Sequence, residues 1–231
     1  MYHSLIISGR NTYTEWGLIP TSRPVVDPPQ VKTTCVDLPA SHGVLDYTSL
    51  LLAEVPYGQR KGSWEFMLRT GADWPSVYSS LLNYLHGERH TVVHEDDPAF
   101  QYVGRLSVNA WKTEPAFSHV TIDYDLDPFK YSVHASDETD WLWDDLFVDV
   151  IRYGTFTVSG TKYRTLVNEG SKSAIPTFTC SAPMTVDSGG STFSLVAGKN
   201  YNANLALPPG GSEMVFHGNG DVTVSYREAS L

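Results

Sequence analysis

The chain of 231 residues suits one large domain or two small ones, and 41% hydrophobic with 18% charged residues is typical of a folded protein. Sixteen basic and 26 acidic residues give a net charge of −10, which disfavours nucleic-acid binding because no basic patch offsets it. No apolar run reaches 18 residues and no signal peptide is recognisable, so we expect no membrane contact. Cys35 and Cys180 are far apart in the sequence. We expect both to be reduced thiols, as in a protein made in a cytoplasm, and a single long-range disulfide is the alternative.

A proline-rich segment spans residues 19–39. Proline cannot donate to a central strand ladder, so we expect an extended arm that leaves the first domain. This arm is our candidate for an element that crosses to a neighbouring subunit, with Pro24, Pro28 and Pro29 as candidate interface residues. Deleting residues 21–30 should then prevent assembly and leave each monomer folded.

The clearest helix signal lies between Asp73 and Gly87, in the stretch "WPSVYSSLLNYLHG". Pro75 suits the first turn, and Gly87 suits the position just past the end. One face of this helix is apolar, formed by Val77, Tyr78, Leu81, Leu82 and Leu85. The helix should therefore lie against a sheet.

Most of the remaining sequence predicts strands, because apolar and polar residues alternate with a period of two. The inward positions of two such strands are Val120, Ile122, Tyr124 and Leu126, and Leu106, Val108 and Ala110. Near the end, Asn219-Gly220 separates two alternating runs and predicts a tight hairpin turn. The predicted fold is mainly β with one helix.

An acidic segment, residues 137–150, predicts a weak helix or a loop. We place a domain boundary just before it, which gives domains at 1–134 and 135–231. Trp141 and Trp143 lie in this segment and are candidate interface residues, since tryptophan contributes strongly to the binding energy of interfaces. A sugar-stacking platform is the alternative role for this pair.

Candidate chemistry is sparse along the chain. His86, His90 and His94 are spaced by four, and with Asp96 they would suit a metal site, but Gly87 ends the helix that would align them. Residues 123–128, "DYDLDP", start like an EF-hand loop but have Pro128 where glycine is required. The sequence contains neither a nucleophile elbow nor a phosphate-binding loop. We therefore expect no enzymatic activity, no cofactor and no resident metal.

An ordered series of stretches resembles the distal tail (Dit) proteins of long-tailed siphophages. The similar stretches are "DLPASHGVLDYT", "YGQRKGSWEFML", "LLNYLHGERHTVVHEDDPAFQYVGRLSV", "DPFKY" and the C-terminal "GNGDVTVSYREASL". Together they cover most of residues 1–131 and the end of the chain. Residues 132–210 are similar only in their strand-rich character.

The resemblance implies an N-terminal domain of β-sandwich or barrel-like type with one helix, whose copies form a homo-hexameric ring. It also implies a C-terminal galectin-like β-sandwich. The implied location is the virion, at the distal end of a long non-contractile tail. The implied partners are the tail tube protein, a tail-tip protein and receptor-binding or other baseplate proteins, with DNA passing through the ring lumen without specific binding.

Three other functions compete with this one. The first is a lectin-like adhesion module that uses Trp141, Trp143 and the C-terminal sandwich to bind saccharides. The second is a metal-dependent hydrolase built around His86, His90, His94 and Asp96. The third is a tail-tube or tail-terminator protein, which would share the ring but occupy another place in the tail.

Overall fold

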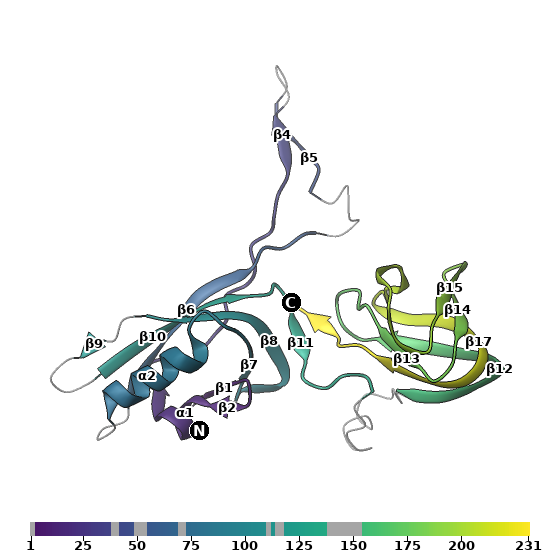
Figure 1. The fold of residues 1–231 in the computed structure, drawn as a ribbon. Coiled ribbons are helices and arrows are strands. Elements are labelled where there is room, and N and C mark those ends of the chain that lie inside the picture. The colour runs from purple at the N-terminus through teal and green to yellow at the C-terminus, as the bar shows by residue number, and fades with distance from the viewer. Residues whose placement is uncertain are drawn as a thin grey trace. The chain divides into compact units, whose positions relative to one another are not determined.

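The structure is a computed structural model and describes residues 3–37, 42–48, 55–68, 73–109, 112–113, 118–137 and 154–231. The chain divides into two compact units (Figure 1). Unit 1 comprises Met1–Lys130 together with Leu231, and unit 2 comprises Tyr131–Ser230. Within the described residues, no helix is long and apolar enough to cross a membrane.

Unit 1 is built around one antiparallel sheet in the order β2-β1-β7-β8-β10-β6-β3, and β9 also pairs with β10. Its strands are β1 (Leu5–Ile7), β2 (Arg10–Asn11), β3 (Leu18–Pro20), β6 (Arg60–Leu68), β7 (Arg89–His94), β8 (Asp97–Val108), β9 (Lys112–Thr113) and β10 (Ser118–Leu126). A separate two-stranded ladder joins β4 (Cys35–Asp37) and β5 (Val44–Asp46). In this sheet β10 lies between β8 and β6, and its Ile122 lies opposite Val108 on one side and Trp64 on the other.

The predicted helix is α2 (Trp74–Leu85), with Asp73 at its N-cap and Gly87 just beyond its end in the left-handed region, at φ 81°. Leu81 and Leu85 are fully buried against the core of the sheet. The apolar face of α2 therefore covers unit 1's sheet, as its spacing predicts (Figure 1). A second helix, α1 (Thr12–Trp16), was not predicted; the Asn11 side chain caps it and Gly17 ends it.

The strand alternation in unit 1 agrees with the sequence analysis. The inward residues of β8 and β10 are buried, as are their neighbours on the other elements of the core. The fully buried large side chains of unit 1 are Leu5, Ile7, Leu18, Phe66, Leu81, Leu85, Leu106, Ile122 and Leu126. Ala110 lies outside the described residues.

Unit 2 contains a six-stranded antiparallel sheet in the order β15-β14-β17-β13-β16, with β12 paired along β17. Its strands are β12 (Thr155–Asn168), β13 (Thr177–Cys180), β14 (Met184–Ser188), β15 (Ser191–Leu195), β16 (Gly198–Tyr201) and β17 (Gly210–Ser225). The short 3-10 helix η2 (Ala203–Leu205) follows β16, and β11 (Lys130–Ser132) pairs with β18 (Ala229–Ser230). The core includes Phe156, Phe178 and Phe216, and the Phe216 ring packs against the rings of the other two.

The predicted hairpin turn at Asn219-Gly220 is wrong, because both residues lie within the continuous strand β17. Gly218 and Gly220 have φ values of 147° and 144°, which favour glycine. A Cβ atom on Gly218 would lie 2.7 Å from the Met184 Cβ, and one on Gly220 would lie 2.5 Å from the Ser181 hydroxyl. These glycines therefore allow the close approach of residues 181–184 to β17 and do not form a turn.

The predicted fold class is confirmed: the chain is mainly β with one main helix. Each unit has one main sheet around its own core, and most of the strand pairings join strands that are not consecutive in the chain.

Candidate interaction surface

The two-stranded ladder of β4 and β5 extends away from unit 1's sheet (Figure 1). It belongs to the protruding hairpin, which we define as the described residues 30–37, 42–48 and 55–58. Val36 lies opposite Leu45, and all six residues of β4 and β5 are exposed. The hairpin thus presents both faces of its ladder to solvent.

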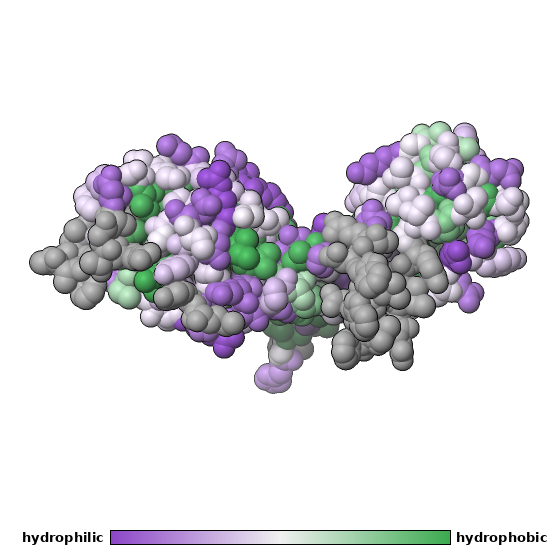
Figure 2. Space-filling model, turned by 90° about the horizontal axis from the view of Figure 1, so that it is seen from below, coloured by the Kyte–Doolittle hydropathy of each residue, from purple (hydrophilic) through white to green (hydrophobic). Residues whose placement is uncertain are grey.

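The protruding hairpin carries an unusual share of exposed apolar side chains. Six of the thirteen exposed large apolar residues described in the chain lie in it: Val31, Val36, Val44, Leu45, Tyr47 and Val55. On the face drawn in Figure 2, by contrast, hydrophobic residues form small patches among hydrophilic ones. Because contiguous exposed apolar surface marks binding sites, the hairpin is the candidate interaction surface of unit 1.

Hydrogen bonds fix the root of the protruding hairpin. The Lys32 amide donates to the Pro56 carbonyl at 2.9 Å, and the Gly58 amide donates to the Gln30 carbonyl at 2.7 Å. The Tyr57 ring packs edge-on against Phe129, with the ring centroids 5.9 Å apart. These contacts therefore anchor the hairpin at one defined position on unit 1.

Arg60, the first residue of β6, lies just beyond this root and is only 5% exposed. Its guanidinium donates to the Pro128 carbonyl at 2.8 Å and to the Asp27 carbonyl at 3.1 Å, and it lies 5.5 Å from the centre of the Tyr102 ring. Burial lowers the pKa of Arg60. The guanidinium still stays charged near neutral pH, because the ordinary pKa of arginine is very high. Arg60 connects the chain entering the hairpin to the chain that follows β10.

Replacing Arg60 by methionine is expected to lower the free energy of unfolding by about 2–4 kcal/mol, because two carbonyl groups lose a charged donor. Urea denaturation measures the change. Lys61→Met is the matched control, because Lys61 is 70% exposed and its ion pair with Asp125 should contribute less than about 1 kcal/mol. Equal stability of the Arg60 variant and the unchanged chain would contradict this role.

The proline-rich segment takes a different course from the predicted arm over its first half. The Trp64 indole donates to the Val25 carbonyl at 2.8 Å, and the Asp27 amide donates to the Tyr124 hydroxyl at 3.1 Å. Val26 packs against unit 1's core. Residues 24–27 thus lie along their own sheet, and the part that leaves the unit begins near residue 30.

The candidate interface prolines occupy different environments. Pro24 is buried within unit 1, Pro29 is half-buried and Pro28 is exposed. Deleting residues 21–30 would remove hydrogen-bond partners of Trp64, Tyr124 and Arg60, so this deletion is not a clean test of assembly. Trp141 and Trp143 lie outside the described residues.

Sequence reasoning did not single out the apolar residues of the hairpin. The sequence did contain one sign of a turn, which is the glycine Gly43 between the stretches that form β4 and β5. In the structure this glycine has a φ of 89°. Each stretch is only three residues long, and alternation cannot be recognised over so short a length. The exposure of Val36, Val44 and Leu45 follows only from the structure.

The candidate metal ligands each have local partners. The His86 imidazole accepts from the Val108 amide at 3.1 Å, and the His90 imidazole bonds to the Ser8 hydroxyl at 3.0 Å. Asp96 pairs with His3 and with Arg23, at 2.8 and 2.9 Å. Among the residues that the structure describes, no three His, Cys, Asp or Glu side chains group in a way that could hold a metal ion.

His94 is buried between the rings of Trp64 and Tyr102, with ring centroids 5.9 and 5.6 Å away. Its imidazole donates a hydrogen bond to the Pro24 carbonyl, and its Nε2 atom has no hydrogen-bond partner. Burial lowers the pKa of His94 and outweighs the opposing effects of that bond and of Asp97 and Asp96. The folded unit therefore holds the neutral imidazole.

The stability of unit 1 is accordingly expected to fall on mild acidification. The unfolded chain protonates His94 below a pKa of about 6.5, whereas the folded chain resists protonation. The stabilisation from the neutral His94 imidazole is fully present above the unfolded-state pKa. It is lost as the pH falls through the lowered folded-state pKa. Urea denaturation from about pH 7.5 to 5.5 should show this slope, and His94→Phe, which keeps the ring contacts, should reduce it. An unchanged slope in the variant would contradict this assignment.

Comparison with known proteins identifies the fold. No protein-family model matches the chain, and no curated protein matches it. Among solved structures, the crystal structure of SPP1 Dit (gp 19.1) is similar over 100% of both chains, with a TM-score of 0.63 and 12% sequence identity. That protein is described as a paradigm of the hub adsorption apparatus in phages that infect Gram-positive bacteria. The fold is thus that of a phage distal tail protein, as the resemblance in the sequence predicts.

Proposed function

We propose that this chain is a structural protein of a phage tail, and that six copies form a ring hub at the distal end of a long non-contractile tail. The observation that carries the proposal is the likeness of fold over the whole length of SPP1 Dit. In this role the chain has no catalytic function. Its location is the virion, after synthesis in the cytoplasm of the bacterial host.

The protruding hairpin is the proposed contact between neighbouring copies. An isolated two-stranded hairpin is at best marginally stable in water, and this one exposes apolar side chains on both strands. Seating it on a second copy would bury those side chains. Each copy would then use its hairpin on one neighbour and a different surface on the other, which is the head-to-tail contact that closes a ring.

The charge of the chain fits a ring that surrounds DNA. Each copy has a net charge of −10, so a ring of six is strongly acidic. Repulsion between acidic residues and phosphates discourages DNA from adhering as it passes. This supports transit of DNA without specific binding.

The two units have separate roles in the proposal. Unit 1 forms the ring and continues the tail tube toward a tail-tip protein. Unit 2 is the proposed galectin-like sandwich that carries receptor-binding or other baseplate proteins. Its antiparallel sheet and its own aromatic core support a separate module.

Solution mass tests the ring directly. Size-exclusion chromatography with light scattering should give six times the chain mass of 25.6 kDa, and negative-stain images of the same peak should show closed rings. A monomer that persists at high protein concentration would contradict self-assembly into a ring.

A further inference from the structure

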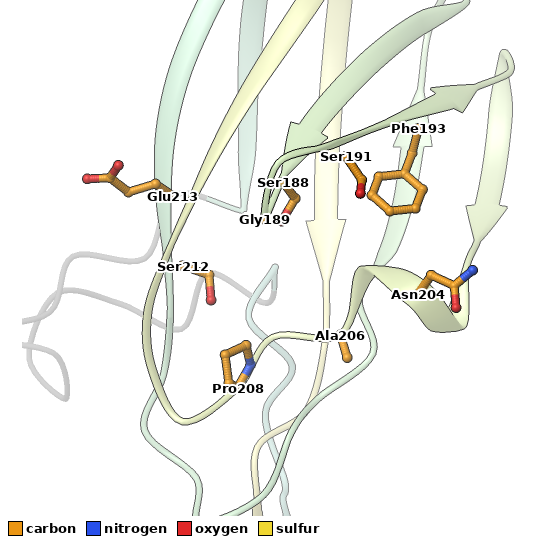
Figure 3. A pocket seen from close by; sticks show the side chains of 9 residues that line it. All are labelled: Ser188, Gly189, Ser191, Phe193, Asn204, Ala206, Pro208, Ser212 and Glu213. Carbon is orange, nitrogen blue, oxygen red and sulfur yellow. The ribbon is translucent and has the colours of Figure 1, made fainter.

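A cavity of about 490 Å³ lies in unit 2, between segments that are distant in the sequence. The turn between β14 and β15 forms one wall, and the chain around and after η2 together with the first residues of β17 forms the other (Figure 3). Sites for small ligands usually have volumes of about 300–1,000 Å³. The cavity is therefore large enough for a small organic ligand.

The cavity combines one aromatic ring with several neutral polar groups. Phe193 packs against unit 2's core and remains half-buried at the cavity, where its ring lies between Ser191 and Asn204 (Figure 3). Ser188 and Ser212 add two further hydroxyl groups. Within the described residues, the side chains of these three serines and of Asn204 make no hydrogen bond, so their donors and acceptors are available.

The electrostatics of the cavity disfavour a charged ligand. None of the described lining residues is basic, so an anionic ligand would find no counter-ion. Glu213 is the single ionisable residue among the described lining residues, and its side chain points away from the other labelled side chains (Figure 3). A cationic ligand would therefore find no carboxylate directed at it.

We propose that this cavity binds a neutral saccharide. The apolar face of a pyranose would pack on Phe193, and its hydroxyl groups would donate to and accept from the serine hydroxyls and the Asn204 amide. An apolar platform with a few convergent polar groups is the usual composition of a small-ligand site. This inference gives unit 2 a binding activity that goes beyond the hub function, and it does not depend on ring formation.

The test screens the full-length chain on a glycan array that carries neutral and acidic saccharides. Saturation-transfer NMR with galactose, glucose, N-acetylglucosamine and their disaccharides then measures binding in solution. At least one neutral saccharide is expected to bind, and glucuronic acid and sialic acid are not. Absence of binding by every neutral saccharide, or binding of acidic saccharides alone, would overturn the proposal.

Two matched variants locate the site. Ala206→Trp places a bulky side chain in the cavity lining and is expected to abolish binding. Ala203→Trp adds the same group to an exposed alanine of η2 that does not line the cavity, and it should leave binding unchanged. Binding that survives in the Ala206 variant would place the saccharide elsewhere and overturn the proposal.

A third variant tests the role of the aromatic ring. Phe193→Leu keeps an apolar side chain against the core and should weaken binding roughly three- to tenfold. Phe193→Tyr retains the ring and should bind like the unchanged chain. Thermal unfolding of each variant shows that unit 2 stays folded, so a loss of binding reports the site. Equal affinity of the leucine variant and the unchanged chain would overturn the stacking role.

Discussion

Replacing Val36 by lysine and Leu45 by glutamate is expected to convert the ring to monomers without changing the fold of either unit. The two residues lie opposite each other in the hairpin and are 47% and 42% exposed. The substitutions keep the net charge and leave an opposite-charge pair that supports the hairpin. They remove two apolar side chains from each subunit contact, worth about 1.5–3 kcal/mol apiece if both become buried, and a ring repeats that loss at every contact.

Light scattering with size exclusion measures the assembly state of this double variant. The control carries Val196→Lys and Tyr201→Glu, which replace exposed apolar residues of unit 2 with the same two charges. We expect the control to form rings as the unchanged chain does. Rings of the Val36 and Leu45 variant with unchanged mass would exclude the protruding hairpin as the subunit contact.

Replacing Phe216 by alanine is expected to destabilise unit 2 by about 3–5 kcal/mol and to leave the unfolding of unit 1 unchanged. Phe216 is fully buried, and its ring centre lies 5.1 Å from that of Phe156 and 6.0 Å from that of Phe178. Removing the ring leaves a cavity in a core that contains none of unit 1's core residues. Scanning calorimetry should therefore show one transition shifted to lower temperature and one unmoved.

The reciprocal variant is Phe66→Ala, which removes a fully buried ring from the core of unit 1. It should shift the other transition and leave that of unit 2 in place. These paired results would establish that the two predicted domains fold separately. A single transition that both variants shift together would contradict the division into two domains.

Local pattern accounts for much of what the sequence predicts correctly. The apolar face of α2 recurs every three to four residues, and Pro75 and Gly87 mark its ends. The inward residues of β10 alternate over nine residues, which is enough to identify the buried face. By contrast, α1 has only five residues, and its signals are confined to the cap at Asn11 and to Gly17.

Asn219-Gly220 shows where a local signal was misleading. The dipeptide favours a tight turn by itself, yet β12 pairs with β17 continuously across this position, from Thr155 to Asn168. The glycines are needed because residues 181–184 approach the strand closely. That approach joins residues more than thirty positions apart, so neighbouring residues do not reveal it.

The sequence by itself determined the mainly β class, the helix and its buried face, and the net charge of −10. These properties depend on composition and on short-range periodicity. Only the tertiary structure decided that residues 24–27 lie along their own sheet, that the chain leaves the unit as a hairpin, and that polar groups surround Phe193 in a cavity. Each of these depends on contacts between distant residues, such as the bonds of Trp64 to Val25 and of Arg60 to Pro128, which no local pattern specifies.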